Sequence, residues 1–308
     1  MGDSGTQILF EGLKYSQSIR EIDLSKNNIS YIGALHISNT LNTNSIIQKI
    51  NLYWNKIGPE GAKYLSQSKG NVSDLNFSDN EIKAEGVKSL ADYLAFSKTL
   101  VSLNLNRNNN YESSFSLHIA EFLAISTSLE KIDIGNNFIG YDGIKAIFLA
   151  LRTNTLSKLS EMSLESNEID NRATSLISDF LQIDSSLISL NLTNNYLGPE
   201  GAQALSLALK LNKSLKMLFL ANNRLGNDGC CYIAQGLRFN KSLVTIDLGK
   251  NDIEKRGINE METAISKNYC LSLQNIIFNE KNIETKSLLN ILSLLKKKRK
   301  MNNIQNIV

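Results

Sequence analysis

The chain has few of the residues on which catalytic and metal sites are usually built. Its 308 residues include three cysteines, two histidines, two prolines and one tryptophan. Three cysteines are too few for a disulfide framework, so we expect reduced thiols in a reducing compartment. His36 and His118 are far apart in the sequence, and neither shows zinc-ligand spacing or a marked nucleophile beside it. We therefore expect a non-enzymatic protein with no cofactor and no metal.

Glycine-rich phosphate loops and a strong net charge are also missing. The sequence contains neither GxxxxGK[ST] nor GxGxxG at a strand-to-helix turn, so nucleotide binding has no support. The 33 basic and 30 acidic residues leave a net charge of +3, which does not favour nucleic-acid binding. No apolar run is long enough to cross a membrane, and the first residues are polar, unlike a secretory leader. We expect a cytoplasmic protein with neither nucleic acid nor membrane as its partner.

What the chain does have is an asparagine that recurs at a nearly constant step of 25 to 30 residues. Apolar residues precede it at eight, five and three positions, as Leu215, Leu218 and Leu220 precede Asn223. Such a period indicates a stack of repeats. The nine asparagines are Asn27, Asn55, Asn80, Asn108, Asn137, Asn167, Asn195, Asn223 and Asn251.

Each repeat is predicted to contain one strand and one helix. Residues 189–193 (SLNLT) alternate polar and apolar, which is typical of a strand with one buried face. The asparagine follows the strand, and its amide can donate to and accept from backbone groups, so stacked repeats would form an asparagine ladder. A glycine usually stands six residues later, before apolar residues at helical spacing such as Ala202, Leu205 and Leu209.

This frame, LxxLxLxxNxIxxxGxxxL, resembles the leucine-rich repeats of the ribonuclease-inhibitor-like class over roughly residues 5 to 290. The resemblance implies an α/β solenoid in the form of a horseshoe, with a parallel sheet on its concave side and helices on its convex side. It also implies protein binding, because relatives of this class include inhibitors that cover an enzyme's active site.

We expect residues 1–308 to form a single domain of about ten repeats. Residues 1–17 are predicted to be an N-terminal half repeat, and residues 271–308 a C-terminal cap and basic tail with Lys281 at the asparagine position. In the fourth repeat Ser114 takes the glycine position. The run Lys296–Lys300 favours a helix C-terminus and keeps an open end soluble, with nuclear import or an anionic surface as the alternative.

The residues between the buried aliphatics of each strand are predicted to face the concave side. Exposed Trp, Tyr and Arg dominate binding hot spots, and Trp54, the only tryptophan, falls on the exposed side of a strand end. Aromatics spread over repeats two to eight fit a folded partner better than a short peptide. The predicted contact residues are Tyr53, Trp54, Asp79, Arg107, Asn109, Phe138, Glu165, Tyr196, Phe219 and Arg224.

Two hypotheses on function follow. The first is a monomeric module that clasps one folded protein partner, with inhibition of an enzyme by covering its active site as the sharper form. A composition rich in Asn, Ile, Lys and Ser resembles that of AT-rich intracellular bacteria, which favours a secreted effector or effector regulator in a host-cell cytoplasm. The alternative is a regulatory scaffold, or the repeat arm of a larger signalling protein. The glutamates Glu161, Glu165 and Glu168 favour an acidic patch for a basic partner over catalysis.

Overall fold

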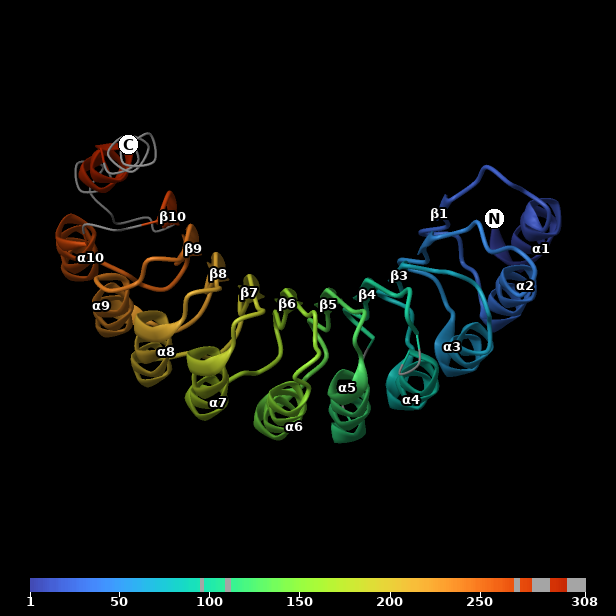
Figure 1. Cartoon of the computed structure of the whole chain (residues 1–308), viewed down its shortest axis with the longest axis horizontal. Helices are drawn as coiled ribbons and strands as arrows, with labels where there is room; N and C mark the ends of the chain where they lie inside the picture. Colours follow the sequence, from blue (N-terminus) through green and yellow to red (C-terminus); the bar gives the residue numbers. More distant parts are fainter. Residues whose placement is uncertain (95–96, 109–111, 269–271, 279–288, 298–308) are drawn as a thin grey trace. The chain divides into compact units, whose positions relative to one another are not determined.

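The computed structural model describes residues 1–94, 97–108, 112–268, 272–278 and 289–297. The chain contains two compact units, Met1–Ser163 (unit 1) and Leu164–Val308 (unit 2). Each unit is a series of strand–helix repeats (Figure 1). Asn109, Cys270 and Lys281 lie outside the described residues. That the whole chain forms one domain stays a prediction.

Unit 1 alternates helices with short parallel strands, and β1 to β6 pair in chain order. Partners stand at matching repeat positions, as Ile50 stands beside Leu75. Its elements are α1 (Gly2–Leu13), β1 (Glu21–Asp23), α2 (Tyr31–Leu41), β2 (Lys49–Asn51), α3 (Gly58–Ser66), β3 (Asp74–Asn76), α4 (Lys83–Leu94), β4 (Ser102–Asn104), α5 (Ser113–Ile125), β5 (Lys131–Asp133), α6 (Gly140–Thr153) and β6 (Glu161–Ser163).

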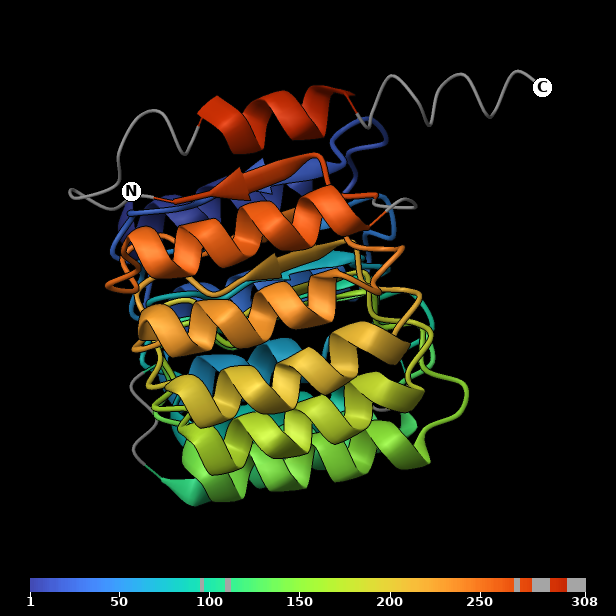
Figure 2. The same cartoon turned by 90° about the vertical axis from the view of Figure 1, so that its left-hand side faces the viewer.

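Unit 2 has the same construction, and β7 to β10 pair in parallel and in chain order. Its helices pack side by side, as the orange helices of Figure 2 show. Residues 289–297 are also helical. The other elements are α7 (Asn171–Ile183), β7 (Ser189–Asn191), α8 (Pro199–Leu211), β8 (Met217–Phe219), α9 (Gly226–Leu237), β9 (Thr245–Asp247), α10 (Lys255–Lys267) and β10 (Asn275–Ile277).

Side chains alternate across each strand as the sequence predicts. The central residue of the inner strands is buried and its two neighbours are partly exposed, as for Leu103 and Leu190. In β1 and β10, each of which pairs with one neighbour among the described strands, the central Ile22 and Ile276 are only half-buried. The core of each unit therefore lies between its strands and its helices.

The predicted asparagine ladder is present. Asn55 Nδ2 donates to the carbonyls of Leu24 and Leu52 at 2.9 Å, and its Oδ1 accepts from the backbone N–H groups of Asn27 (3.1 Å) and Ile29 (2.9 Å). Asn108 and Asn251 repeat this arrangement from fully buried positions. Each ladder amide thus joins its own strand end to the preceding repeat.

A second asparagine ladder lies at the other end of the helices, outside the repeat frame predicted from the sequence. Asn212 Nδ2 donates to the carbonyls of Leu181 (2.8 Å) and Asp184 (3.2 Å), which end the preceding helix. Asn240 and Asn268 do the same one and two repeats later. These residues stand seventeen positions after a first-ladder asparagine. The signal was therefore the same 28-residue spacing, shifted along the repeat.

Helix α1 packs against α2 as the helices of complete repeats pack on one another. The Asp3 carboxylate accepts from the backbone N–H groups of Ser30 (2.8 Å) and Gly33 (2.9 Å) at the start of α2. Asn171 and Asn227 bond in the same way to the helices that follow them. Burial raises the pKa of Asp3, but hydrogen bonds from Ser30 and Gly33 outweigh that effect and hold it below its ordinary value.

The fourth repeat differs from the prediction. Gly229 faces Ala202, and Gly257 faces Cys230. Ala202 and Cys230 each stand seven positions after the ladder asparagine of their own repeat. Gly143 instead faces Ser116, eight positions after Asn108. One extra residue therefore precedes α5, and the assignment of Ser114 to the glycine position is wrong. Phe115 occupies that position and is fully buried.

Gly236 permits a close approach between neighbouring helices, and this gives a testable effect on stability. A methyl group there would press on the backbone of Ser206 and on Leu209 Cβ, whereas one on Gly12 would meet open space. Alanine favours a helix by about 1 kcal/mol over glycine, but overpacking costs about 1–3 kcal/mol. We expect Gly236→Ala to lower the urea midpoint and Gly12→Ala to leave it unchanged or raise it. A raised midpoint for Gly236→Ala would contradict the close packing.

Candidate protein-binding site

The residue before each of the nine ladder asparagines has a left-handed backbone, with φ between 52° and 59°. Its N–H still bonds to the next repeat, as Trp54 N does to the carbonyl of Ser78 (3.0 Å), so the turn is fixed by strand stacking. Asparagine tolerates this conformation, and Asn136, Asn194 and Asn222 occupy it. A tryptophan there is a true outlier. Such strain, about 1–3 kcal/mol, clusters at functional sites.

Trp54 lies in a small cluster just beyond β2. Its side chain is 59% exposed, and its ring meets that of Tyr53 edge to face, with centroids 6.0 Å apart. The Lys26 ammonium lies 5.1 Å from the Trp54 centroid and 5.5 Å from that of Tyr53. These contacts hold the two rings in place while leaving much of the indole in solvent. The cluster is therefore a preorganised aromatic anchor.

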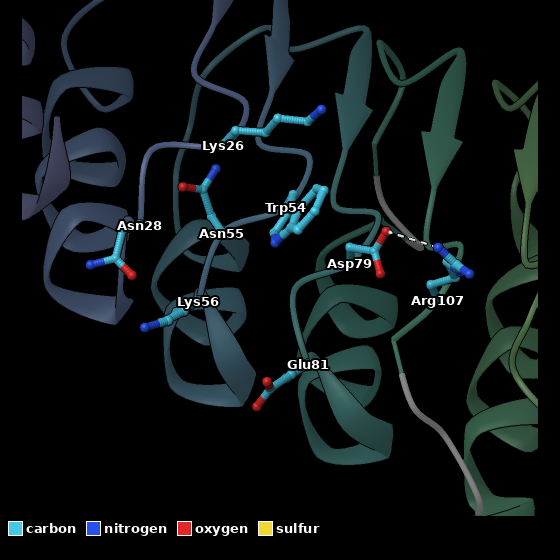
Figure 3. Close-up of a pocket in the computed structure, with 8 residues that line it drawn as sticks. All are labelled: Lys26, Asn28, Trp54, Asn55, Lys56, Asp79, Glu81 and Arg107. Atoms are coloured by element: carbon cyan, nitrogen blue, oxygen red, sulfur yellow. Dashed lines mark ion pairs between the residues drawn. The ribbon is translucent and has the colours of Figure 1, made fainter.

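The cluster borders a shallow hollow of about 430 Å³ in unit 1. Figure 3 shows that its walls come from the turns after four successive strands, with Trp54 between Lys26 and Asp79. Arg107 Nη1 lies 3.9 Å from Asp79 Oδ2, too far for a tight ion pair. Both groups thus keep hydrogen-bonding capacity. The lining residues are Lys26, Asn28, Trp54, Asn55, Lys56, Asp79, Glu81 and Arg107.

The hollow brings together some of the predicted contact residues. Trp54, Asp79 and Arg107 line it, and the Tyr53 ring meets that of Trp54 edge to face. Phe138 does not line it but is exposed in a later turn with a left-handed backbone. Asn109 lies outside the described residues. Lys26, which contacts both rings, was missed as an anchor because contacts between turns are not visible in the repeat frame.

The predicted contact residues of unit 2 form a different arrangement. The Arg224 guanidinium lies 4.5 Å from the ring centroid of Tyr196, and both side chains are exposed. Glu165 accepts from Asn194 Nδ2 (3.0 Å) and Asn191 Nδ2 (3.4 Å), and Asn222 Nδ2 donates to Asn194 Oδ1. Glu165 is therefore part of a polar network. The Tyr196–Arg224 pair presents an aromatic face and a cation to solvent.

Phe219 differs from the residue type found at the last position of most strands. The last residue of a strand is usually Asp or Asn, and its Oδ1 accepts a hydrogen bond from the backbone N–H two residues later. Asn76 accepts in this way from Ser78 (2.9 Å), and Asp247 from Gly249 (2.9 Å). The same bond holds at Asp23, Asn51, Asn104, Asp133 and Asn191. Phe219 cannot accept it and is only half-buried. A position that is structural elsewhere thus carries an accessible aromatic ring.

Restoring the usual residue should stabilise the protein. In Phe219→Asn, the new carboxamide would accept from the N–H of Ala221, as Asn191 accepts from Thr193. One such bond contributes about 0.5–1.5 kcal/mol, and the half-buried ring loses little packing. We expect a small rise in the free energy of unfolding by chemical denaturation. Destabilisation by more than about 1 kcal/mol would mean that Phe219 is a packing residue and not a contact residue.

Ion pairing or burial accounts for several of the other reactive groups in the part of the chain that the structure describes. Lys131 Nζ lies 2.8 Å from Glu161 Oε1. Burial raises the pKa of the Cys230 thiol far above its ordinary value and also raises that of Cys231, so neither is an activated nucleophile. Across the described ranges, no three His, Cys, Asp or Glu side chains are grouped to hold a metal ion. Within those ranges, no helix is both long and apolar enough to cross a membrane.

Comparison with known proteins agrees with this architecture. The family model of the Leucine Rich repeat matches residues 15–38, 43–66, 71–91, 126–148 and 184–206. In three dimensions the chain is similar to the leucine-rich repeat-containing protein LegL7 from Legionella pneumophila, with a TM-score of 0.58 and 20% identity. The match covers 95% of this chain and 93% of LegL7. It shows the fold.

Curated relatives share part of the chain. Ribonuclease inhibitor from Mus musculus is 25% identical over 59% of this chain and 40% of its own length. NACHT, LRR and PYD domains-containing protein 14 from Mus musculus is 29% identical over 60% of this chain, which is 19% of that protein. The chain thus spans less than half the length of these relatives. The repeats that match the family model and the solenoid fold make this chain a leucine-rich-repeat protein whose repeats resemble those of the ribonuclease-inhibitor-like class.

Proposed function

We propose that the chain binds one folded protein partner through the turns that follow its strands. The observation that carries this proposal is Trp54, the only tryptophan, which is exposed and stands in a left-handed turn that asparagine would occupy with less strain. A residue that strains the backbone and buries little of its ring contributes little to folding. The role of Trp54 is therefore to contact another molecule.

The chemistry of the hollow indicates the kind of contact. Trp54 and Tyr53 supply an apolar anchor, and Lys26, Asp79 and Arg107 surround it with both signs of charge. An apolar centre with a polar rim is the usual anatomy of a protein–protein interface. In unit 2 we assign the same role to Phe219 and the Tyr196–Arg224 pair. Phe138 and Glu165 complete the proposed contact set with Asn109.

Inhibition of an enzyme is the sharper form of the proposal. It is supported by the similarity to mouse ribonuclease inhibitor over 59% of the chain. A partner that binds across several strand ends would have part of its own surface covered by this chain. If the partner is an enzyme whose active site meets the Trp54 cluster, activity should fall in proportion to occupancy by the wild-type chain and recover with Trp54→Asn.

The alternative is that the chain is a scaffold or the repeat arm of a larger signalling protein. The similarity to a small part of a NACHT- and PYD-containing protein favours this alternative. A partner that binds Trp54 without any change in its own activity would support the scaffold role. The suggestion of a secreted bacterial effector in a host-cell cytoplasm rests on composition alone, and a translocation reporter fused to the chain would test it.

Capture of the partner tests the proposed function. The wild-type chain, Trp54→Asn and the exposed α4 variant Lys88→Glu would be used as bait in extract from the native cell, with captured proteins identified by mass spectrometry. We expect one stoichiometric protein that wild type and Lys88→Glu retain and that Trp54→Asn loses. Equal retention by all three baits would contradict the proposed surface.

A further inference from the structure

The helix ends of unit 2 carry a second exposed surface. Ile183 ends α7, Leu211 ends α8, and Phe239 lies two residues after α9. These three side chains, here named the rim stripe, are 57–62% exposed. Each stands sixteen positions after its ladder asparagine, so they occupy one repeat position in three successive repeats. Single exposed apolar residues are ordinary, but a row of three in adjacent repeats forms a patch.

The second asparagine ladder holds the rim stripe in register. Asn212, which follows Leu211, bonds to the carbonyls of Leu181 and Asp184 on either side of Ile183. Asn240, which follows Phe239, bonds to the carbonyl of Leu209 at 2.8 Å. Gly236 lets α9 approach the backbone of α8 closely at the same end. The stripe is therefore preorganised, which lowers the entropic cost of binding.

The two ends of the rim stripe have neighbouring residues of opposite charge. Exposed lysines lie beside the middle and the Phe239 end of the stripe: Lys213 and Lys241 stand two residues after Leu211 and Phe239, and Lys267 takes the stripe position in the next repeat. Among the described residues these three lysines make no ion pair. Within unit 2, the charged residues nearest to Ile183 in the sequence are the acidic Asp179 and Asp184.

We propose that the rim stripe docks an amphipathic helix of a protein partner, with acidic residues at the end that meets Phe239 and Lys267. Neighbouring packed helices lie about 8–10 Å apart. A helix laid across them advances about 10.5 Å every seven residues. Apolar side chains seven residues apart would therefore reach Ile183, Leu211 and Phe239 in turn. Carboxylates beside the second and third of them would lie near the three lysines.

An anionic membrane fits the same surface less well. Asp179 and Asp184 beside Ile183 would face headgroups of like charge and oppose insertion of that end. A helix can instead place neutral or basic residues there. This surface is separate from the strand-end turns of unit 2, so the inference does not depend on the Trp54 site.

The test uses two synthetic helical peptides of 24 residues with leucines at three positions spaced by seven. One carries glutamates around the last leucine, and the other carries lysines at those positions. Fluorescence anisotropy would measure the affinity of each for the full chain. We expect the acidic peptide to bind at least tenfold more tightly than the basic one. The double variant Leu211→Ser/Phe239→Ser should lower its affinity at least tenfold, and Lys241→Glu/Lys267→Glu should reverse the preference.

Controls separate docking from loss of fold and from lipid binding. Leu149→Ser, an equally exposed leucine on α6, should bind the acidic peptide like wild type, and all variants should keep the wild-type circular dichroism. Vesicles of phosphatidylcholine with and without phosphatidylserine provide the membrane arm. Equal affinity for the two peptides, no binding of the acidic peptide, or vesicle binding that requires Phe239 in place of peptide binding would each overturn the proposal.

Discussion

Replacing Trp54 by asparagine should weaken binding of the partner by about 2 kcal/mol or more, roughly thirtyfold, because a central aromatic anchor is lost. Asparagine is the informative substitution, since it occupies the same left-handed turn in Asn136, Asn194 and Asn222. The variant relieves backbone strain, so the free energy of unfolding should not fall by more than about 0.5 kcal/mol. Isothermal titration calorimetry would give the affinity, and urea unfolding the stability.

Neighbouring substitutions define the extent of this effect. Tyr53→Ala removes the ring that holds the indole, and we expect a comparable loss of affinity. Arg107→Ala should cost less because Arg107 lies at the edge of the hollow and is only loosely paired with Asp79. Lys88→Glu on α4 should bind like wild type. If Lys88→Glu abolished binding while Trp54→Asn retained it, the binding site would lie on the helices and not on the strand-end turns.

Removing a ladder amide should strongly destabilise the fold. Asn195 is buried and takes part in five hydrogen bonds: its Nδ2 donates to the carbonyls of Leu164, Leu192 and Thr193, and its Oδ1 accepts from the N–H groups of Asn167 and Ile169. Asn195→Ala leaves the buried N–H groups of Asn167 and Ile169 without their acceptor, whereas the carbonyls of Leu192 and Thr193 keep hydrogen bonds from Asn223 and Ser166. We expect a loss of about 1–3 kcal/mol in the free energy of unfolding.

The matched control is Asn259→Ala. Asn259 is exposed on α10, a helix of the same unit, and alanine there should change stability by less than about 0.5 kcal/mol. Both variants would be compared by urea denaturation at equal protein concentration. An unchanged midpoint for Asn195→Ala would show that the ladder hydrogen bonds contribute no net stability at that repeat.

Much of the fold could be predicted from the regular spacing of apolar residues and asparagines. The spacing of Leu215, Leu218 and Leu220 before Asn223 predicts the strand, its buried face and the ladder, because each depends on contacts that recur in every repeat. The fourth repeat could not be placed correctly because one extra residue between Asn108 and α5 shifts the helix without changing the apolar spacing inside it. Phe115 therefore reached the position assigned to Ser114.

The site was predictable only in part. Alternation along β2 indicates that Trp54 is exposed, but its left-handed backbone depends on the hydrogen bond from its N–H to the next repeat. The recurrent asparagines at that position were a usable signal. The contact of Lys26 with both aromatic rings depends on how two turns approach one another, which no pattern within one repeat encodes.

The central claim is that Trp54 meets the partner, and because it is the only tryptophan, one spectrum can test it. The chain would be labelled with 5-fluorotryptophan, and its single ¹⁹F resonance followed during titration with the unlabelled partner. We predict a shift or broadening that saturates with binding, together with loss of the difference between H₂O and D₂O as the indole leaves solvent. A resonance that keeps its position, width and solvent sensitivity at saturating partner would contradict the claim.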